Sequence, residues 1–164
     1  MEIAGDQPVF ETSLLLAGDV DRANVHRQLS RWTKAGRLYQ LRRRVYALAP
    51  PFQKAKPHPF LVANRMVQPS YVSLQSALSH YALIPEAVPV TTSVTTLRPC
   101  RWDTPLGSYA FRRIKTALFQ DYRLLHVDDE QEAFVASPEK ALLDLIYLEP
   151  GADSDAYLKE LRLQ

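Results

Sequence analysis

A chain of 164 residues can form one medium-sized domain or two small ones. Hydrophobic residues make up 46% of the sequence and charged residues 23%, which is ordinary globular usage and excludes wholesale disorder. No stretch approaches the roughly 18 consecutive apolar residues that a membrane span needs, and the sequence does not begin with a signal-peptide pattern. We therefore expect a soluble, cytoplasmic protein with no membrane partner.

The net charge of +2 is divided unevenly along the chain. Residues 1–56 carry ten basic and five acidic side chains, whereas residues 57–164 carry ten basic and thirteen acidic ones. Within residues 22–44 there are eight basic side chains and no acidic one. Such a local density of positive charge attracts polyanions, so double-stranded DNA is the expected partner.

Two helices are predicted in the first part of the chain. Apolar residues at helical spacing over residues 10–17 predict a short helix that ends before a turn at residues 18–19. A second helix is predicted over residues 22–35, because Asp21 can accept hydrogen bonds from its free backbone N–H groups and Gly36 suits its C-terminal end.

The second predicted helix has one apolar side. Val25, Leu29 and Trp32 recur at spacings of four and three residues and form a stripe that we assign to the core. The remaining polar and basic residues are the candidate DNA contacts of this helix: Arg22, Asn24, His26, Arg27, Ser30, Arg31 and Lys34. The cationic members suit phosphates, and the others offer polar groups to base edges.

A β-hairpin is predicted after Gly36, where apolar and aromatic residues flank the run Arg42, Arg43 and Arg44. These three arginines are the candidate phosphate contacts of the hairpin. Two helices joined by a tight turn and followed by a basic hairpin are the parts of a winged helix-turn-helix, whose second helix enters the major groove. We assign this module to residues 1–50.

A proline-rich linker is expected over residues 51–60, because its composition favours extended backbone. The rest, 61–164, is expected to be a mixed α and β domain, so the fold class of the chain is α+β. Its predicted helices lie near 60–67, 74–81 and from Pro138 onward, and its predicted strands at 70–73, 88–97, 109–114 and 122–127. Another amphipathic helix begins near Tyr157 with no ending signal before Gln164, so we expect the sequence to be a piece of a longer chain.

Several phrases of the sequence resemble the antitoxins of AbiEi-type bacterial abortive-infection systems and related viral-defence regulators. They occur in the family's order and cover most of residues 10–150: Ala35-Gly36-Arg37-Leu38, Leu41-Arg42-Arg43 with Val45-Tyr46, Pro69 to Leu74 with Ser76-Ala77-Leu78, Leu83 to Glu86, Thr92 to Thr96, Thr104 to Gly107 and Ser137 to Leu145. The resemblance implies a transcriptional autorepressor whose winged helix binds inverted repeats in its own promoter. It also implies an antitoxin that counteracts a nucleotidyltransferase-like toxin. In such a type IV system the antitoxin and the toxin need not bind each other directly.

The sequence departs from the family at the predicted hairpin tip, where Arg44 stands in place of the usual glycine. A tight turn there needs a positive φ, so we expect it to be strained or shifted. Inverted repeats require two winged helices on the DNA. Either a homodimer presents both of them, or two copies bind the half-sites independently. No coiled-coil seam decides between them.

Catalysis is not expected. A nucleotidyltransferase-like site needs a glycine-serine turn beside paired carboxylates, and the nearest candidates, Gly107-Ser108 and Asp128-Asp129-Glu130, are far apart in sequence, the second in a predicted hairpin loop. The scattered histidines and single cysteine indicate neither a metal site nor a cofactor, and Cys100 suits a small buried side chain. The alternative function is a protein-interaction module that uses the winged helix as a scaffold, without specific DNA binding.

Overall fold

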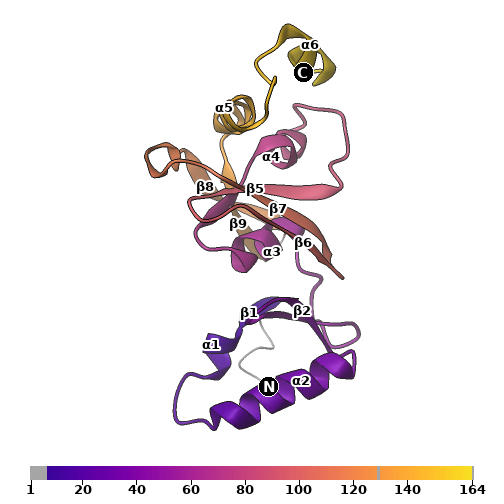
Figure 1. The fold of residues 1–164 in the computed structure, drawn as a ribbon. Helices are drawn as coiled ribbons and strands as arrows, with labels where there is room; N and C mark the ends of the chain where they lie inside the picture. The colour runs from indigo at the N-terminus through magenta and orange to yellow at the C-terminus, as the bar shows by residue number, and fades with distance from the viewer. Residues whose placement is uncertain (1–6, 129, 164) are drawn as a thin grey trace.

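The computed structural model describes residues 7–128 and 130–163, which form a mixed α+β fold with two sheets (Figure 1). In the N-terminal part, two helices interrupt a three-stranded antiparallel sheet whose strand order is β1-β3-β2. The elements are β1 (Val9–Glu11), α1 (Thr12–Leu15), α2 (Arg22–Lys34), β2 (Leu38–Arg42) and β3 (Val45–Leu48). The α+β class expected from the sequence is confirmed.

The rest of the described chain is built on a six-stranded mixed sheet with the order β6-β7-β5-β4-β9-β8. Its elements are α3 (Pro59–Met66), β4 (Ser70–Val72), α4 (Leu74–His80), β5 (Val90–Thr95), β6 (Cys100–Thr104), β7 (Gly107–Arg113), the short 3₁₀ helix η2 (Thr116–Leu118), β8 (Tyr122–Asp128), β9 (Gln131–Ala136), α5 (Pro138–Leu148) and α6 (Asp155–Glu160). Within the described ranges, no helix has the length and apolar character to cross a membrane.

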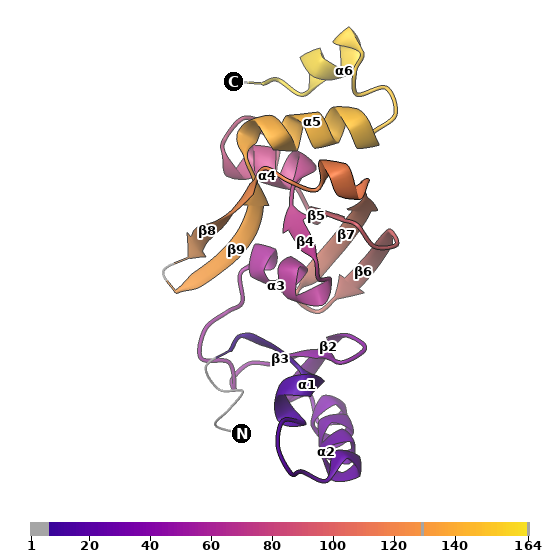
Figure 2. The same ribbon diagram turned by 90° about the vertical axis from the view of Figure 1, so that its left-hand side faces the viewer.

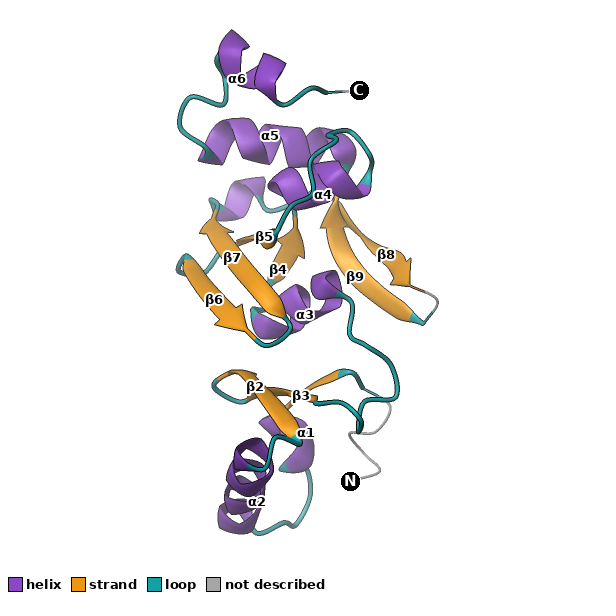
Figure 3. Ribbon diagram, turned by 90° about the vertical axis from the view of Figure 1, so that its right-hand side faces the viewer, coloured by secondary structure: helices purple, strands orange, loops and turns teal. Residues whose placement is uncertain are grey.

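Helix α3 lies between the two sheets, and α4 and α5 lie together on the other side of the six-stranded sheet (Figure 2). Helix α2 is therefore at one end of the molecule and α6 at the other, as Figure 3 also shows. The helices and sheets follow one another as layers, and α2 is the outermost layer of the N-terminal part.

The three-stranded sheet is covered on both faces. Along β1, Val9 joins the large hydrophobic cluster around α3, whereas its neighbour Phe10 joins a small cluster beneath α2. Along β3, Val45 faces the first cluster and Leu48 the second. Alternate residues of a strand point to opposite faces, so this sheet connects the two cores.

The proline-rich stretch is held against the second part of the chain by one glutamine. The Gln131 Oε1 accepts a hydrogen bond from the His58 backbone N–H at 2.7 Å, and its Nε2 donates to the Lys56 carbonyl at 3.0 Å. Gln131 itself is buried. Residues 51–58 form neither helix nor strand, and α3 begins at Pro59, inside the segment assigned to the linker. The division of the chain into two domains stays a prediction.

Most predicted elements occur within one or two residues of their expected positions, but three strands were not assigned. The chain forms β1 at Val9–Glu11, where a helix was predicted from Phe10, so the helix α1 contains only Thr12–Leu15. Strand β6 has the apolar and charged alternation of an edge strand, a signal that could have identified it. Strand β9, after the predicted hairpin loop, contains two alanines and a glutamate, and its pairing with β8 and β4 overrides that weak propensity.

A buried ion pair within α5 is hydrogen-bonded to residues of and next to β4. The Lys140 ammonium donates to one carboxylate oxygen of Asp144, and both side chains are buried. The other oxygen accepts hydrogen bonds from the Tyr71 hydroxyl at 3.0 Å and the Ser73 hydroxyl at 2.7 Å. Burial and the Asp144 carboxylate raise the pKa of Tyr71 above its ordinary range, so its hydroxyl remains a donor. Lys140 and Asp144 therefore belong to the core, not to a partner surface.

We expect Asp144→Ala to lower the free energy of unfolding by about 3–5 kcal/mol, because it leaves the Lys140 ammonium buried without its partner. Replacing the pair together, Lys140→Met with Asp144→Leu, removes both charges and should recover part of that loss. Urea denaturation measures both, with the exposed Asp153→Ala as the control, which should change stability by less than about 0.5 kcal/mol. Equal losses for Asp144→Ala and the control would contradict the assigned role of the pair.

His58 makes the folded state sensitive to acid. Its Nδ1 accepts a hydrogen bond from the Phe60 backbone N–H at 3.2 Å, which caps α3 and requires the neutral ring. Burial lowers the pKa of His58 below 6.5; the Asp128 charge opposes this shift and His80 adds to it. The unfolded chain therefore binds a proton at a higher pH than the folded chain does.

We expect the His58 contribution to stability to be present above about pH 6.5 and to be lost as the pH falls through the lowered pKa. His58→Asn keeps a cap acceptor without a titrating ring, so its stability should change less between neutral pH and about pH 5. Thermal unfolding at a series of pH values compares it with wild type and with His26→Asn, a change at an exposed histidine. A pH dependence unaltered in His58→Asn would exclude this mechanism.

Candidate nucleic-acid interface

Helix α2 begins at the residue that the sequence predicted. The Asp21 carboxylate accepts hydrogen bonds from the backbone N–H groups of Ala23 at 2.9 Å and Asn24 at 3.1 Å. These are free N–H groups of the first turn, and a negative charge there also suits the helix dipole. The N-terminal end of α2 is thereby fixed without an acidic residue on the helix itself.

The C-terminal end of α2 is closed by Gly36, whose φ is +69°. The Gly36 N–H donates to the Thr33 carbonyl at 3.1 Å, and the next N–H, of Arg37, donates to the Trp32 carbonyl at 2.9 Å. This pair of bonds is the Schellman arrangement, which requires a left-handed residue. Glycine adopts that conformation without a Cβ penalty, so the chain turns directly from α2 into β2.

The apolar stripe of α2 packs as the sequence predicted. Leu29 is buried, and Val25 and Trp32 are half-buried beside it. Their contacts on the sheet side are Phe10, Leu38 and Leu48. This packing places Trp32 in the core of the module and fixes which side of α2 faces solvent.

All seven candidate residues of α2 are exposed: Arg22, Asn24, His26, Arg27, Ser30, Arg31 and Lys34. At about 100° per residue, Arg27 and Lys34 project directly opposite the apolar stripe. Ser30 and Arg31 lie beside them, and Asn24 and His26 lie toward opposite flanks. From Arg27 to Lys34 the outward side of α2 is thus polar and cationic, whereas in the first turn Ala23 faces outward and Arg22 lies nearer the apolar stripe.

An ion pair among the described residues touches this surface. The Arg27 guanidinium lies 3.9 Å from the Asp21 carboxylate, and both side chains are more than 60% exposed. A long, solvent-exposed pair of this kind contributes little to stability. Arg27 can therefore exchange this contact for another anion at small cost.

The β2–β3 hairpin carries the three predicted arginines at its turn. Arg43 and Arg44 are exposed and Arg42 is half-buried. Arg44 has a φ of +71°, the left-handed conformation that a glycine usually supplies. Its carbonyl accepts hydrogen bonds from the Thr12 N–H at 2.8 Å and the Thr12 hydroxyl at 3.3 Å, so the turn is anchored to the start of α1.

Arg37 is an additional exposed cation that the site prediction left out. It lies immediately after α2, and its guanidinium carbon is 5.7 Å from the centre of the Phe52 ring. The signal was available, because Arg37 is one of the eight basic residues of the segment 22–44.

The N-terminal part also contains an apolar pocket of about 270 Å³ between α1, α2 and the sheet. Leu14, Leu15, Val25 and Trp32 line it and are only half-buried, and Val20 at its edge is 40% exposed. A pocket lined almost wholly by carbon atoms suits an apolar group.

The residues considered for catalysis are not brought together. Ser108 is the second residue of β7, and its hydroxyl donates to the Asp103 carboxylate at 2.6 Å. Asp128 is the last residue of β8, and three strands of the sheet separate β7 from β8. Asp129 lies outside the described residues. Among the described histidine, cysteine and acidic residues, no group of three is placed to hold a metal ion. Cys100 is half-buried.

Comparisons with known proteins assign no family. No protein-family model matches this chain, and no curated protein is significantly similar to it in sequence.

We expect Arg44→Gly to raise the free energy of unfolding by about 1 kcal/mol, because glycine adopts the left-handed turn without strain. Gly36→Ala should lower it by a similar amount for the opposite reason, since the space around Gly36 is open and only its φ resists the change. Chemical denaturation of the two variants checks both signs. A destabilising Arg44→Gly would mean that the arginine side chain makes a contact worth more than the backbone strain.

Proposed function

We propose that this protein is a DNA-binding transcriptional repressor that reads double-stranded DNA with α2 and grips neighbouring phosphates with the β2–β3 hairpin. The observation that carries the proposal is the exposed cationic side of α2, which the packing of Leu29 and the two end caps hold in one orientation. A helix presented in this way fits the major groove.

The element order supports the proposal. A short helix, a second helix and a hairpin follow one another, and β1 pairs with β3 so that the sheet order is β1-β3-β2. This is how a winged helix-turn-helix arranges its recognition helix and its wing. Arg43 and Arg44 occupy the turn of the proposed wing, where a phosphate would meet them.

The antitoxin part of the proposal rests on the resemblance in sequence. It makes the protein an autorepressor and antitoxin of a type IV abortive-infection system, which binds inverted repeats in its own promoter and counteracts a nucleotidyltransferase-like toxin. A gene for such a toxin beside the gene of this protein is the expected genomic setting.

The test is binding to the protein's own upstream DNA across a salt series, with a variant in which Arg27, Arg31, Arg42 and Arg43 become alanine. We expect the variant to lose promoter-selective binding. We also expect the slope of log affinity against log salt to fall by about 0.9 for each removed cation that contacts a phosphate.

A matched control removes four exposed cations from the second part of the chain: Arg98, Arg101, Arg113 and Lys115, each to alanine. The change in net charge is the same, so a purely non-specific attraction to DNA would weaken equally in both variants. An equal loss of DNA affinity in the two variants would contradict the proposed interface. If wild type binds DNA no more tightly at low salt than the variant at Arg27, Arg31, Arg42 and Arg43, DNA binding by this surface is excluded.

A protein-interaction module is the second candidate, favoured by the apolar pocket between α1 and α2. A partner that inserts an apolar side chain there would be lost with Val20→Glu, which leaves the cations in place. DNA binding that survives Val20→Glu and fails in the arginine variant supports the repressor. A protein partner lost with Val20→Glu, together with no promoter binding, supports the alternative.

A further inference from the structure

Strand β8 is an outer strand of the six-stranded sheet, and one of its edges has no partner among the described residues. Asp121 and Ser137 lie opposite each other when the β8–β9 register is extended by one residue, and the Ser137 N–H donates to the Asp121 carbonyl at 3.0 Å. This bond shows which residues of β8 point their backbone groups toward β9: every second residue, starting at Asp121. Because the phase alternates along an antiparallel pair, the backbone groups of Tyr122, Leu124 and His126 point away from β9.

The opposite edge of β9 agrees with this phase. Beyond the end of β4, the Asn64 side chain pairs with the Phe134 backbone, accepting from its N–H at 2.6 Å and donating to its carbonyl at 3.4 Å. The Phe134 backbone therefore points away from β8, and Leu124, directly opposite in register, points its own backbone outward.

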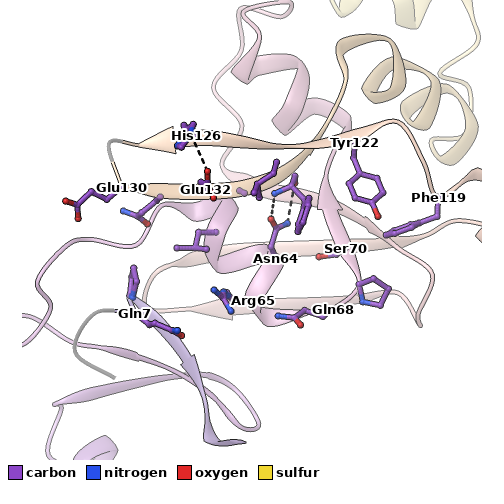
Figure 4. Close-up of a pocket in the computed structure, with 17 residues that line it drawn as sticks. Gln7, Asn64, Arg65, Gln68, Ser70, Phe119, Tyr122, His126, Glu130 and Glu132 are labelled. Atoms are coloured by element: carbon purple, nitrogen blue, oxygen red, sulfur yellow. Dashed lines mark hydrogen bonds and ion pairs between the residues drawn. The ribbon is translucent and has the colours of Figure 1, made fainter. Parts of the chain in front are cut away.

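The same three β8 residues line a groove of about 950 Å³, together with α3 (Figure 4). Leu124 and Phe134 are cross-strand neighbours on this face, yet they are 50% and 43% exposed. Tyr122 lies at one end of the pair, and His126, 3.3 Å from the Glu132 carboxylate, lies at the other. An apolar pair beside an open strand edge is a surface that another strand can cover.

The other outer strand, β6, is protected by its sequence. Pro99 and Pro105 flank it, and its exposed residues Arg101 and Asp103 carry charge. Prolines and charges are the usual means of preventing pairing at a sheet edge. Between Tyr122 and His126, β8 has no proline, and its charged residue, Arg123, lies on the face away from the groove.

We propose that a second copy of this chain covers the β8 edge, with the two β8 strands antiparallel about a twofold axis at Leu124. This register joins all the outward backbone groups, because Tyr122 then faces His126 of the partner subunit and Leu124 faces the partner's Leu124. One apolar row crosses the axis, from Phe134 through Leu124 to the partner's Leu124 and the partner's Phe134.

Charge also agrees with a second copy as the occupant. In this register Arg123 lies opposite the partner's Leu125, so no like charges meet directly across the axis. The pairing is self-complementary, as a twofold interface requires. It does not depend on DNA binding, although it would present two copies of α2 related by the symmetry of an inverted repeat.

Sedimentation velocity on the whole chain over a concentration series tests the interface. We expect wild type to approach twice the monomer mass and Leu124→Lys to weaken the dimer at least about tenfold, because two ammonium groups would meet at the axis. Leu97→Lys, a change at an equally exposed leucine outside the groove, should leave the dimer unchanged. A monomeric wild type at every concentration, or a dimer that tolerates Leu124→Lys, overturns the proposal.

Cross-linking tests the register in folded protein. In a Cys100→Ser background, Leu124→Cys should form a covalent dimer with a short bis-maleimide cross-linker, because only at the axis does a residue lie directly opposite its own copy, at the roughly 5.5 Å spacing of a hydrogen-bonded pair that a spacer can bridge. Leu97→Cys is the control that should remain monomeric. Cross-linking of both variants to the same extent overturns the register.

Discussion

The three-stranded sheet β1-β3-β2 has to be covered on both faces, and the rest of the structure depends on that constraint. Val9 and Val45 make one face apolar, and Phe10 and Leu48 make the other apolar. Helix α2, together with the short α1, covers the second face, so the apolar stripe of α2 is committed inward. The cationic side of α2 must then point to solvent, because a helix with one apolar stripe has its charges opposite that stripe.

On the other side, α3 and the body of the protein cover the sheet. Buried charges in that body are arranged in a complete network, in which the Asp144 carboxylate receives Lys140, Tyr71 and Ser73. A network of this kind rigidifies the packing of α5 against β4, since the Tyr71 and Ser73 hydroxyls and the Lys140 ammonium all donate to the Asp144 carboxylate. The N-terminal helix α2 is thereby displayed from a firm base, which a surface that recognises a fixed ligand geometry needs.

The proposed roles divide between the two ends of this arrangement. The proposed DNA surface depends on charge and exposure, whereas the proposed dimer surface depends on unpaired backbone groups and an apolar pair. Salt screens the first and affects the second little, because long-range charge attraction weakens with ionic strength while hydrogen bonding and apolar burial do not depend on it in the same way. The two surfaces use different residues, so each can be altered without the other.

The sequence by itself determined the ends and the faces of α2, because Asp21, Gly36 and the spacing of Val25, Leu29 and Trp32 act over a few residues. It also indicated that the turn at Arg44 would be strained or shifted, and the structure gives Arg44 a positive φ, with a register shift between Gln40 and Arg42. The exposure of the candidate DNA-contact residues on α2 followed from the same local pattern.

Only the tertiary structure decided the features that depend on distant residues. The short strand β1 exists because β3, more than thirty residues away, offers it backbone partners, and local spacing alone favoured a helix there. Lys140 and Asp144 resemble surface charges in the sequence, and they are buried because Tyr71 and Ser73 lie beside them in the fold. Likewise, the open edge of β8 exists only once the order of the six strands is set, since hydrogen-bond pairing between strands is a long-range property of the chain.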